Sequence, residues 1–126
     1  MEPLIIAATD DTPEITLDKS RSVFDINGRS LPEDIIQFYA PVFSWLEQYV
    51  ADPNETTLLK VRIDYFNSAS QRALNEIFTI LSRILVKGKS VDVEWHFNED
   101  DDEMKEAGEE FAEITKLPFR YISYVP

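Results

Sequence analysis

The sequence predicts an α/β fold: a mixed, mostly parallel sheet with helices packed mainly on one face, in the order βββ-α-β-α-β-α-β. Two kinds of segment follow each other along the chain. In the shorter ones every second residue is apolar, which is typical of strands, and in the longer ones apolar residues recur every three or four positions, which is typical of helices. Such alternation favours crossover connections between parallel strands. The strand-like segments have a single apolar face, so helices are expected on one side only. With 126 residues, 44% of them hydrophobic, the chain is expected to form one domain over residues 1–126.

Three short strands are expected before the first helix. Residues 4–7 and 14–18 are strand candidates, separated by a turn-forming cluster at 9–13. Residues 22–27 form the third, and Asn27-Gly28 then predicts a tight turn. These three strands are expected to form a meander or hairpin at one side of the sheet.

The first helix is predicted near residues 33–51. Ser30-Leu31-Pro32-Glu33 has the pattern of a capping box with a proline in the first turn. Pro41 lies inside the helical pattern and is expected to kink or divide the helix, because it removes one backbone hydrogen bond. The apolar positions at helical spacing are Ile35, Ile36, Tyr39, Val42, Phe43, Leu46, Tyr49 and Val50.

The rest of the chain alternates between strand and helix. Strands are predicted at 58–66, 91–97 and 119–125, and helices near 68–87 and 101–115. The residues expected to face the core from the strand at 58–66 are Leu59, Val61, Ile63 and Tyr65, and those from the strand at 91–97 are Val91, Val93, Trp95 and Phe97. The helical positions expected inside are Ala73, Leu74, Ile77, Phe78, Leu81, Ile84 and Leu85, then Met104, Ala107, Phe111 and Ile114; Trp45 is also expected in the core.

Composition excludes several classes of function. The chain has 24 acidic and 12 basic residues and a formal net charge of -12, so it is not expected to bind nucleic acid or anionic membranes. The absence of cysteine excludes disulfides, thiol catalysis and cysteine-ligated metals. No targeting segment or membrane-spanning stretch is visible, so a cytoplasmic location is expected. No cofactor is expected.

Ser68 lies where the strand at 58–66 is followed by a helix, at an edge where open α/β sheets place their functional sites. Two interpretations are open. In the first, Ser68 is only the N-cap and forms a capping box with Gln71, a role that contributes about 1 kcal/mol. In the second, its hydroxyl is a phosphoacceptor, and the phosphate would lie at the positive end of the helix.

The other polar clusters favour structural roles. The acidic run at 99–103, continued along the next helix, lacks the ligand spacing and glycine of a calcium loop. A solvated acidic face is therefore the favoured interpretation, and a surface that faces a partner is the second. His96 is expected among Asp92 and Glu94 on the polar side of its strand. A hydrolytic triad of Ser68, His96 and Asp64 is disfavoured, because the chain has no Gly-x-Ser-x-Gly motif.

Four separated stretches resemble, in order, the motifs of the SiaC family of regulatory phosphoproteins. They are residues 24–34, residues 38–46, the Asp-Tyr-Phe-Asn-Ser-Ala-Ser run at 64–70, and a C-terminal part. That last part comprises Trp95, the acidic run at 98–103, Gly108-Glu109-Glu110-Phe111 and Pro118-Phe119. The similarity covers nearly the whole chain.

The resemblance implies a STAS-like fold, similar to the antagonists of anti-sigma factors, and a mechanism to go with it. In those proteins a Ser/Thr protein kinase phosphorylates a hydroxyl at the start of a helix, and a PP2C-type phosphatase removes the phosphate. The family's phosphoacceptor follows the signature asparagine, here Asn67, which implies Ser68 as the site. Many members have a hydroxyl residue next, where this chain has Ala69, so Ser70 remains a minor candidate. The resemblance further implies that the unphosphorylated protein binds and activates an output protein such as a diguanylate cyclase.

These observations predict a non-enzymatic, partner-switching protein. The residues expected to bind the partner are Ser30, Glu33, Asp34, Asn67, Ser68, Gln71, Arg72 and Asn75. Two alternatives stay open: a small acidic enzyme that uses carboxylates or His96, and a structural interaction module in which Ser68 is only a helix cap.

Overall fold

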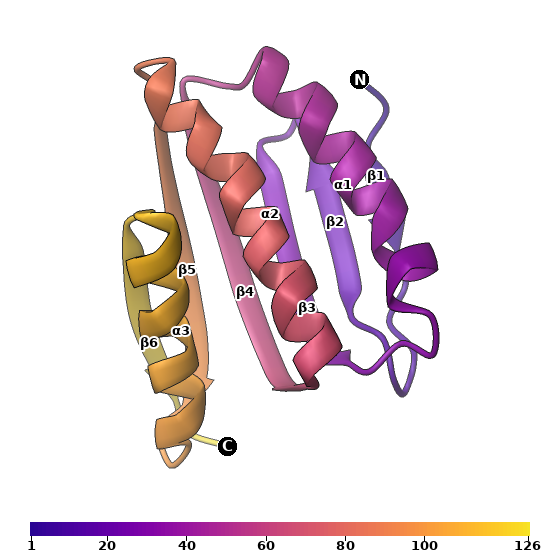
Figure 1. Cartoon of the computed structure of the whole chain (residues 1–126), viewed down its shortest axis with the longest axis vertical. Helices are drawn as coiled ribbons and strands as arrows, with labels where there is room; N and C mark the ends of the chain where they lie inside the picture. The colour runs from indigo at the N-terminus through magenta and orange to yellow at the C-terminus, as the bar shows by residue number, and fades with distance from the viewer.

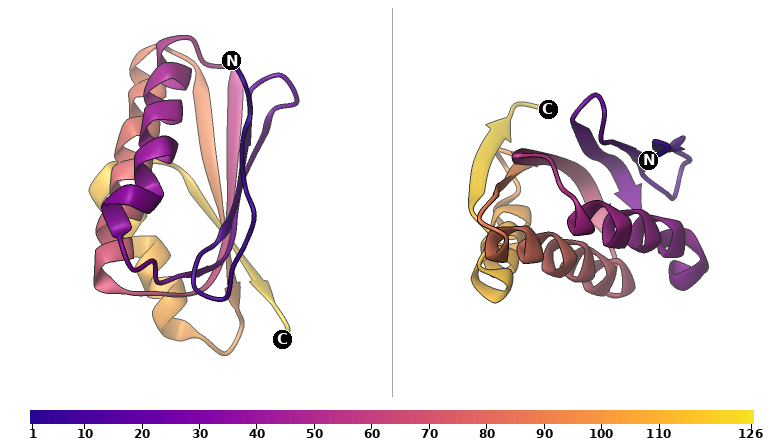
Figure 2. Two further views of the ribbon diagram at one scale, coloured as in Figure 1. Left: turned by 90° about the vertical axis from the view of Figure 1, so that its right-hand side faces the viewer. Right: turned by 90° about the horizontal axis from the view of Figure 1, so that it is seen from above.

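A six-stranded sheet with three helices on one face makes up the computed structural model, which describes residues 1–126 (Figures 1 and 2). The elements confirm the predicted order, and their ends lie within two residues of the expected ones except where noted below. They are β1 (Leu4–Ile6), β2 (Glu14–Asp18), β3 (Val23–Ser30), α1 (Ile35–Ala51), β4 (Thr56–Phe66), α2 (Ser68–Val86), β5 (Ser90–Asn98), α3 (Asp102–Thr115) and β6 (Phe119–Tyr124).

The strands lie in the sheet in the same order as in the chain, from β1 to β6. The first three are antiparallel, which confirms the predicted meander, and β3 to β6 are parallel. Each crossover therefore moves one place in the same direction. Because right-handed crossovers that all move one way lie on one side, α1, α2 and α3 share a face and begin at the same edge of the sheet (Figure 1).

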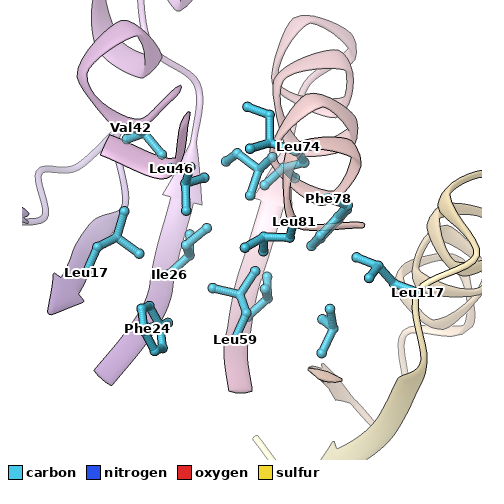
Figure 3. Packing of buried hydrophobic residues seen from close by; sticks show 14 of the residues in the cluster. Leu17, Phe24, Ile26, Val42, Leu46, Leu59, Leu74, Phe78, Leu81 and Leu117 are labelled. Atoms are coloured by element: carbon cyan, nitrogen blue, oxygen red, sulfur yellow. The ribbon is translucent and has the colours of Figure 1, made fainter. Parts of the chain in front are cut away.

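The hydrophobic core fills the space between this face and the helices (Figure 3). Leu59, Leu74 and Phe78 are among its fully buried members, and Trp45, Trp95 and Phe111 are buried as predicted. Three isoleucine or leucine positions expected inside are instead exposed: Ile36, Leu85 and Ile114. None of the helices is both long and apolar enough to cross a membrane.

The predicted tight turn at Asn27-Gly28 is wrong, because both residues lie inside β3. Gly28 has a φ of 129°, a conformation that residues with a side chain rarely adopt. The strand therefore continues through Gly28 with a shift in its pairing, and no turn forms. The register shifts there: Gly28 pairs with Ile63 and Arg29 pairs with Tyr65, so Asp64 has no partner on β3.

This bulge also corrects the predicted alternation of β4. After the extra residue Asp64, the side chain of Tyr65 faces solvent, and Phe66 takes the inward place. Phe66 packs with its ring centroid 6.5 Å from that of Trp95 and 6.2 Å from that of Phe111. The bulge therefore sets the direction in which the chain enters α2.

The capping box predicted at Ser30–Glu33 is also wrong. The N-cap of α1 is Asp34, whose Oδ1 accepts a hydrogen bond from the N–H of Gln37 at 3.0 Å, so Pro32 lies before the helix. Pro41 does not divide α1, which runs unbroken to Ala51. Both Pro41 and Gln37 are exposed, so water can satisfy the carbonyl that the proline leaves without a donor.

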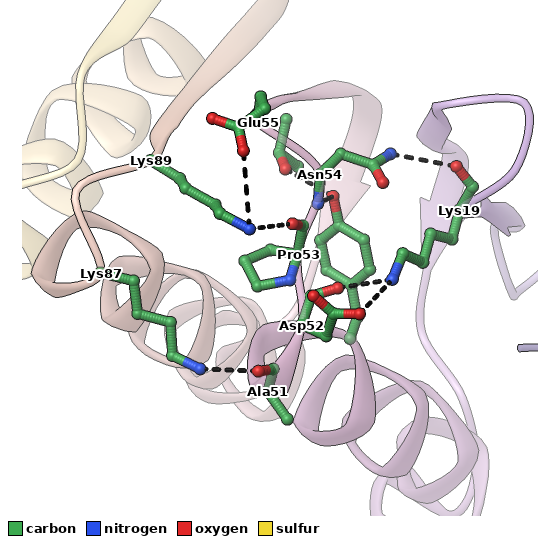
Figure 4. Close-up of polar contacts among 10 residues, drawn as sticks. Lys19, Ala51, Asp52, Pro53, Asn54, Glu55, Lys87 and Lys89 are labelled. Atoms are coloured by element: carbon green, nitrogen blue, oxygen red, sulfur yellow. Dashed lines mark hydrogen bonds and ion pairs between the residues drawn. The ribbon is translucent and has the colours of Figure 1, made fainter.

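Three lysines donate hydrogen bonds to carbonyl oxygens at the C-terminal end of α1 (Figure 4). Each donates from Nζ to one carbonyl oxygen: Lys19 to Asp52 at 2.6 Å, Lys87 to Ala51 at 2.8 Å and Lys89 to Pro53 at 2.8 Å. The last turn of a helix leaves such carbonyls unpaired and carries partial negative charge, which cations stabilise. The hydrogen bond from Lys19 also lowers the pKa of Asp52 below its ordinary value.

Candidate functional site

The start of α2 is the candidate site. β4 ends at Phe66, and the single residue Asn67 connects it to the helix. Asn67 is extended, and its side-chain oxygen accepts a hydrogen bond from the N–H of Ser70 at 2.9 Å. Asn67 is therefore the N-cap, and the prediction that Ser68 caps the helix with Gln71 is wrong. Because β4 is extended up to Phe66, the cap falls one residue earlier than the capping-box pattern suggested.

Ser68 is exposed, and its hydroxyl makes no hydrogen bond. It is the first residue of α2, and the N–H groups of Ser68 and Ala69 have no acceptor, because no earlier helical carbonyl exists for them. The N–H of Ser70 is taken by the Asn67 side chain and that of Gln71 by the Asn67 carbonyl at 2.9 Å. An anionic group on Ser68 would thus meet two free donors and the positive end of the helix.

Ser70 and Ser30 lie beneath this surface, both fully buried. Ser70 Oγ donates to the Ser30 carbonyl at 2.8 Å, and Ser30 Oγ donates to Ser70 Oγ at 2.7 Å. Each hydroxyl has one proton, so the Tyr39 hydroxyl, 2.6 Å from Ser30 Oγ, must be the donor in that pair. Burial raises the pKa of Tyr39 and so favours this protonated form. The three side chains join α1, the end of β3 and α2.

Two of the predicted site residues, Ser30 and Ser70, are thus buried inside the fold. Neither Ser30 nor Ser70 reaches solvent, so Ser30 offers no surface to a partner and the Ser70 hydroxyl offers none to a kinase. Their burial could not be seen in the sequence, because both are small polar residues beside turn-forming segments.

The remaining predicted residues lie around Ser68. Glu33 and Asp34 are exposed before α1, and Gln71 and Arg72 are exposed on α2. Asn75 is half-buried, and its Oδ1 is buried without a hydrogen-bond partner. A hollow of about 320 Å³ between α2 and α3 brings part of this set together. It is lined by Ser68, Gln71, Arg72, Asn75, Glu110, Phe111 and Ile114.

A second hollow, of about 350 Å³, lies between α1 and α2. It is lined by Ile35, Ile36, Phe43, Ala69, Arg72, Ala73 and Glu76. This hollow was not predicted, because the isoleucines and Phe43 fit the helical core pattern. The adjacent Ile35 and Ile36 were the available signal, since two neighbouring positions of a helix cannot both face the core fully.

His96 lies on the opposite, helix-free face of the sheet, with Nε2 3.0 Å from Glu94 Oε1. It lines a hollow with Asp25, Lys60 and Arg62 that does not include Ser68. The structure therefore does not bring Ser68 and His96 together. Nowhere in residues 1–126 do three or more histidine or acidic side chains gather in a geometry that could hold a metal ion.

The acidic run before α3 has a local structural role. Asp101 is the N-cap of α3, and its Oδ1 accepts a hydrogen bond from the N–H of Met104 at 3.0 Å. Asp102 and Glu103 occupy the first turn, where negative charge stabilises a helix.

Comparison with known proteins gives one consistent result. A family model described as "SiaC family regulatory phosphoprotein" matches residues 6–124, which confirms the resemblance found in the sequence. An uncharacterized protein of Pseudomonas aeruginosa strain UCBPP-PA14 is 30% identical over 119 residues, 94% of either chain.

Solved structures agree. The crystal structure of apo-SiaC from P. aeruginosa superposes with a TM-score of 0.89 at 29% identity, covering 98% of this chain and 100% of that one. This chain is also similar to a chain in the crystal structure of the diguanylate cyclase SiaD in complex with its activator SiaC from P. aeruginosa. There the TM-score is 0.89 at 29% identity, and the match covers 96% of this chain and 99% of the other.

Proposed function

Because the chain belongs to the SiaC family of regulatory phosphoproteins, we propose that it is a partner-switching protein controlled by reversible phosphorylation of Ser68. In its unphosphorylated form it binds and activates an output protein, a diguanylate cyclase. This extends to the present chain what is known of the similar SiaC, which occurs in a complex with the cyclase that it activates. A Ser/Thr protein kinase adds the phosphate and a PP2C-type phosphatase removes it.

One observation carries the choice of Ser68: its hydroxyl is exposed and free. Asn67 caps α2, so a kinase can modify Ser68 Oγ without breaking a hydrogen bond of the fold. Ser70, the minor candidate, donates to the Ser30 carbonyl from a fully buried position, which argues against its modification in the folded protein.

The proposed partner surface surrounds Ser68 at the edge where the helices begin. Its predicted members that reach solvent are Glu33, Asp34, Asn67, Ser68, Gln71, Arg72 and Asn75. A phosphate adds about -1.5 to -2 charges, and an interface shaped for a neutral serine would lose several kcal/mol to its bulk and desolvation.

The competing hypothesis of a small enzyme has no comparable support. Its best nucleophile and base, Ser68 and His96, belong to opposite faces of the sheet. The sheet also lacks a point where the strand order reverses, the place where open α/β folds form their catalytic crevices. We therefore assign no catalytic group to the chain, and kinase and phosphatase act on it in trans.

Intact-mass measurement of the protein from the cells that make it tests the modification. We expect a fraction of the protein to carry one phosphate that phosphatase removes, and fragmentation should locate it at Ser68. Ser68→Ala should abolish it, whereas Ser82→Ala, a change at another serine of α2, should leave it unchanged. A phosphate located only elsewhere would contradict the assignment.

Affinity measurements test the switch itself. The phosphorylated protein should bind its output cyclase more weakly than the unphosphorylated one, and Ser68→Ala should retain binding. Ser68→Asp should weaken binding less than the phosphate does, because Asp has one charge and a smaller volume. Equal affinities of the phosphorylated and unphosphorylated proteins would refute the proposal.

A further inference from the structure

Arg72 lines both hollows beside α2. Its side chain is exposed, and its guanidinium makes no hydrogen bond and no ion pair, although the chain has 24 acidic residues. By contrast, Arg83 pairs with Glu47 and Arg120 with Asp92. Arg72 is thus available to bind an anion from outside the fold.

The hollow between α1 and α2 has the chemistry of an anchoring pocket. Five of its seven lining residues are hydrophobic, and Ile36 at its edge is 76% exposed. Arg72 is the only cation among the residues that line it and Glu76 the only anion, and the two form no ion pair with each other. Apolar pockets next to an uncommitted arginine are typical of the energetic centres of protein interfaces. The ligand that fits has an apolar side chain for the hollow and a carboxylate for Arg72.

Ser68 and Arg72 are four residues apart on α2, a spacing at which side chains lie on the same side of a helix. Both line the hollow between α2 and α3. A phosphate on Ser68 is therefore within reach of the Arg72 guanidinium. An arginine binds a phosphate with charge-assisted, often bidentate hydrogen bonds, and the intramolecular contact needs no second molecule.

We propose that Arg72 couples the state of Ser68 to the binding of the output protein. In the unphosphorylated protein, Arg72 binds a carboxylate on a segment of the partner that also places an apolar side chain in the α1–α2 hollow. Phosphate on Ser68 draws Arg72 toward the α2–α3 hollow, and the partner's carboxylate is left without its cation. This inference rests on the proposed function and names the partner's chemistry and the reason for its release.

Phosphorus NMR tests the intramolecular half without any partner. Phosphoserine is incorporated at position 68, and the second pKa of the phosphate, ordinarily about 6, is measured. Contact with Arg72 should lower that pKa, so Arg72→Gln should raise it by roughly 0.5 units in this exposed setting. Arg83→Gln, on the same helix but paired with Glu47, is the matched control and should leave it unchanged. An unchanged value in Arg72→Gln would overturn capture of the arginine.

Photo-crosslinking in the cells that make the protein tests the docking half. A benzoylphenylalanine replaces Ile36, or Gln71 beside Ser68, or Val86, which is 90% exposed at the other end of α2. Position 36 should trap one peptide of the output protein, with apolar residues and an Asp or Glu, and phosphoserine at 68 should reduce the yield. Position 86 should trap none of it.

The outcomes separate the two proposals. A partner trapped at position 71 but not at 36 would overturn the α1–α2 docking surface and leave the phosphorylation switch standing. A second copy of this chain trapped at 36, or a peptide without a carboxylate, would also overturn the inference. No trapped partner at either 36 or 71 would overturn both proposals.

Discussion

Asn67 determines what the next residue can do. Its side-chain oxygen satisfies the N–H of Ser70 and its carbonyl that of Gln71, so the Ser68 hydroxyl has no structural task. Ser68 lies at the start of a helix, as predicted, but the N-cap is Asn67 and not Ser68. Asn and Ser are equally good caps, and only the extended backbone of Asn67 decides between them.

Replacement of the cap should therefore be costly where replacement of Ser68 is not. We expect Asn67→Ala to reduce the free energy of unfolding by about 1 kcal/mol, through loss of the bond to Ser70, as measured by urea denaturation. Ser68→Ala should change it by less than about 0.5 kcal/mol, and Asn67→Asp should retain most of the wild-type value. A Ser68→Ala loss as large as that of Asn67→Ala would show that the serine is the cap.

The buried hydroxyls beneath the site could not be predicted from the sequence. Ser30, Ser70 and Tyr39 come from three elements, and their mutual hydrogen bonds exist only once those elements pack. Ser30 looked like the start of a helix and Ser70 like an exposed first-turn residue. Periodicity finds apolar faces, but it does not reveal polar side chains that satisfy one another inside them.

Tyr39 gives this network a signature at high pH. Burial raises its pKa above the ordinary value of 10.0, so the folded protein keeps a proton that the unfolded chain loses. The stabilisation is complete below pH 10 and is lost as the pH rises toward the folded pKa. Above pH 10, the free energy of unfolding should therefore fall with pH, and Tyr39→Phe should remove about 1.4 kcal/mol per pH unit of that slope.

The control for that slope is Val42→Ala. It removes buried methyl groups from the same helix but no titrating group, so it should lower stability at every pH and keep the wild-type slope. Tyr121 and Tyr124 also have raised pKa values and contribute to the slope that remains in Tyr39→Phe. Identical slopes for Tyr39→Phe and the wild type would contradict the role given to Tyr39.

Among the elements, α3 depends on one close approach to the sheet. A Cβ on Gly108 would lie 2.6 Å from Cδ1 of Trp95, a buried ring. The ring is also fixed, because its Nε1 donates to the Met104 carbonyl at 2.9 Å. The glycine therefore lets the helix contact the indole face, and this helix forms one wall of the hollow next to Ser68.

Gly108→Ala should consequently destabilise the protein, even though alanine is the better helix former. Overpacking against Trp95 costs about 1–3 kcal/mol and the gain in helix propensity is about 1 kcal/mol, so a net loss is expected. Chemical denaturation followed by tryptophan fluorescence measures it. Glu109→Ala, at the exposed neighbouring position, should have little effect. A stabilised Gly108→Ala protein would mean that Trp95 moves easily and that the contact does not position α3.

The order and type of the elements were predictable from periodicity, and their irregularities were not. The bulge at Asp64 reverses the facing of Tyr65 and Phe66, and nothing in the alternation of apolar residues marks it. The exposed Ile36 and Ile114 fit helical core spacing as well as buried residues do. The sequence therefore predicted residues of α2 that line a hollow, such as Gln71 and Arg72, but not which residues of α1 and α3 form the opposite walls.

At the scale of the whole molecule, phosphorylation should act locally. The buried part of α2, including Leu74, Ile77 and Phe78, is anchored in the core, and the two free N–H groups of Ser68 and Ala69 can donate to the phosphate oxygens without rearrangement. The attraction of the helix end, about 1–2 kcal/mol, is opposed by the acidic surroundings. The thermal midpoint should thus move by only a few degrees.

Amide hydrogen exchange of the two forms checks this. Differences in protection should be confined to residues 64–75 and the adjacent segment 30–34, which meets α2 through Ser30. Protein treated with phosphatase after phosphorylation should return to the original pattern and serves as the control. Loss of protection throughout β4 and β5 would show that the phosphate unfolds the domain instead.

The strictly sequential strand order has a consequence for how the chain folds. Every strand pairs with the strand next to it in sequence, so no contact in the sheet waits for a distant segment. Topologies dominated by nearby contacts lose less chain entropy before their contacts form, and they fold faster than those with distant pairings. As the polypeptide leaves the ribosome, each new helix and strand can add to an edge that already exists, and β6 completes the domain last.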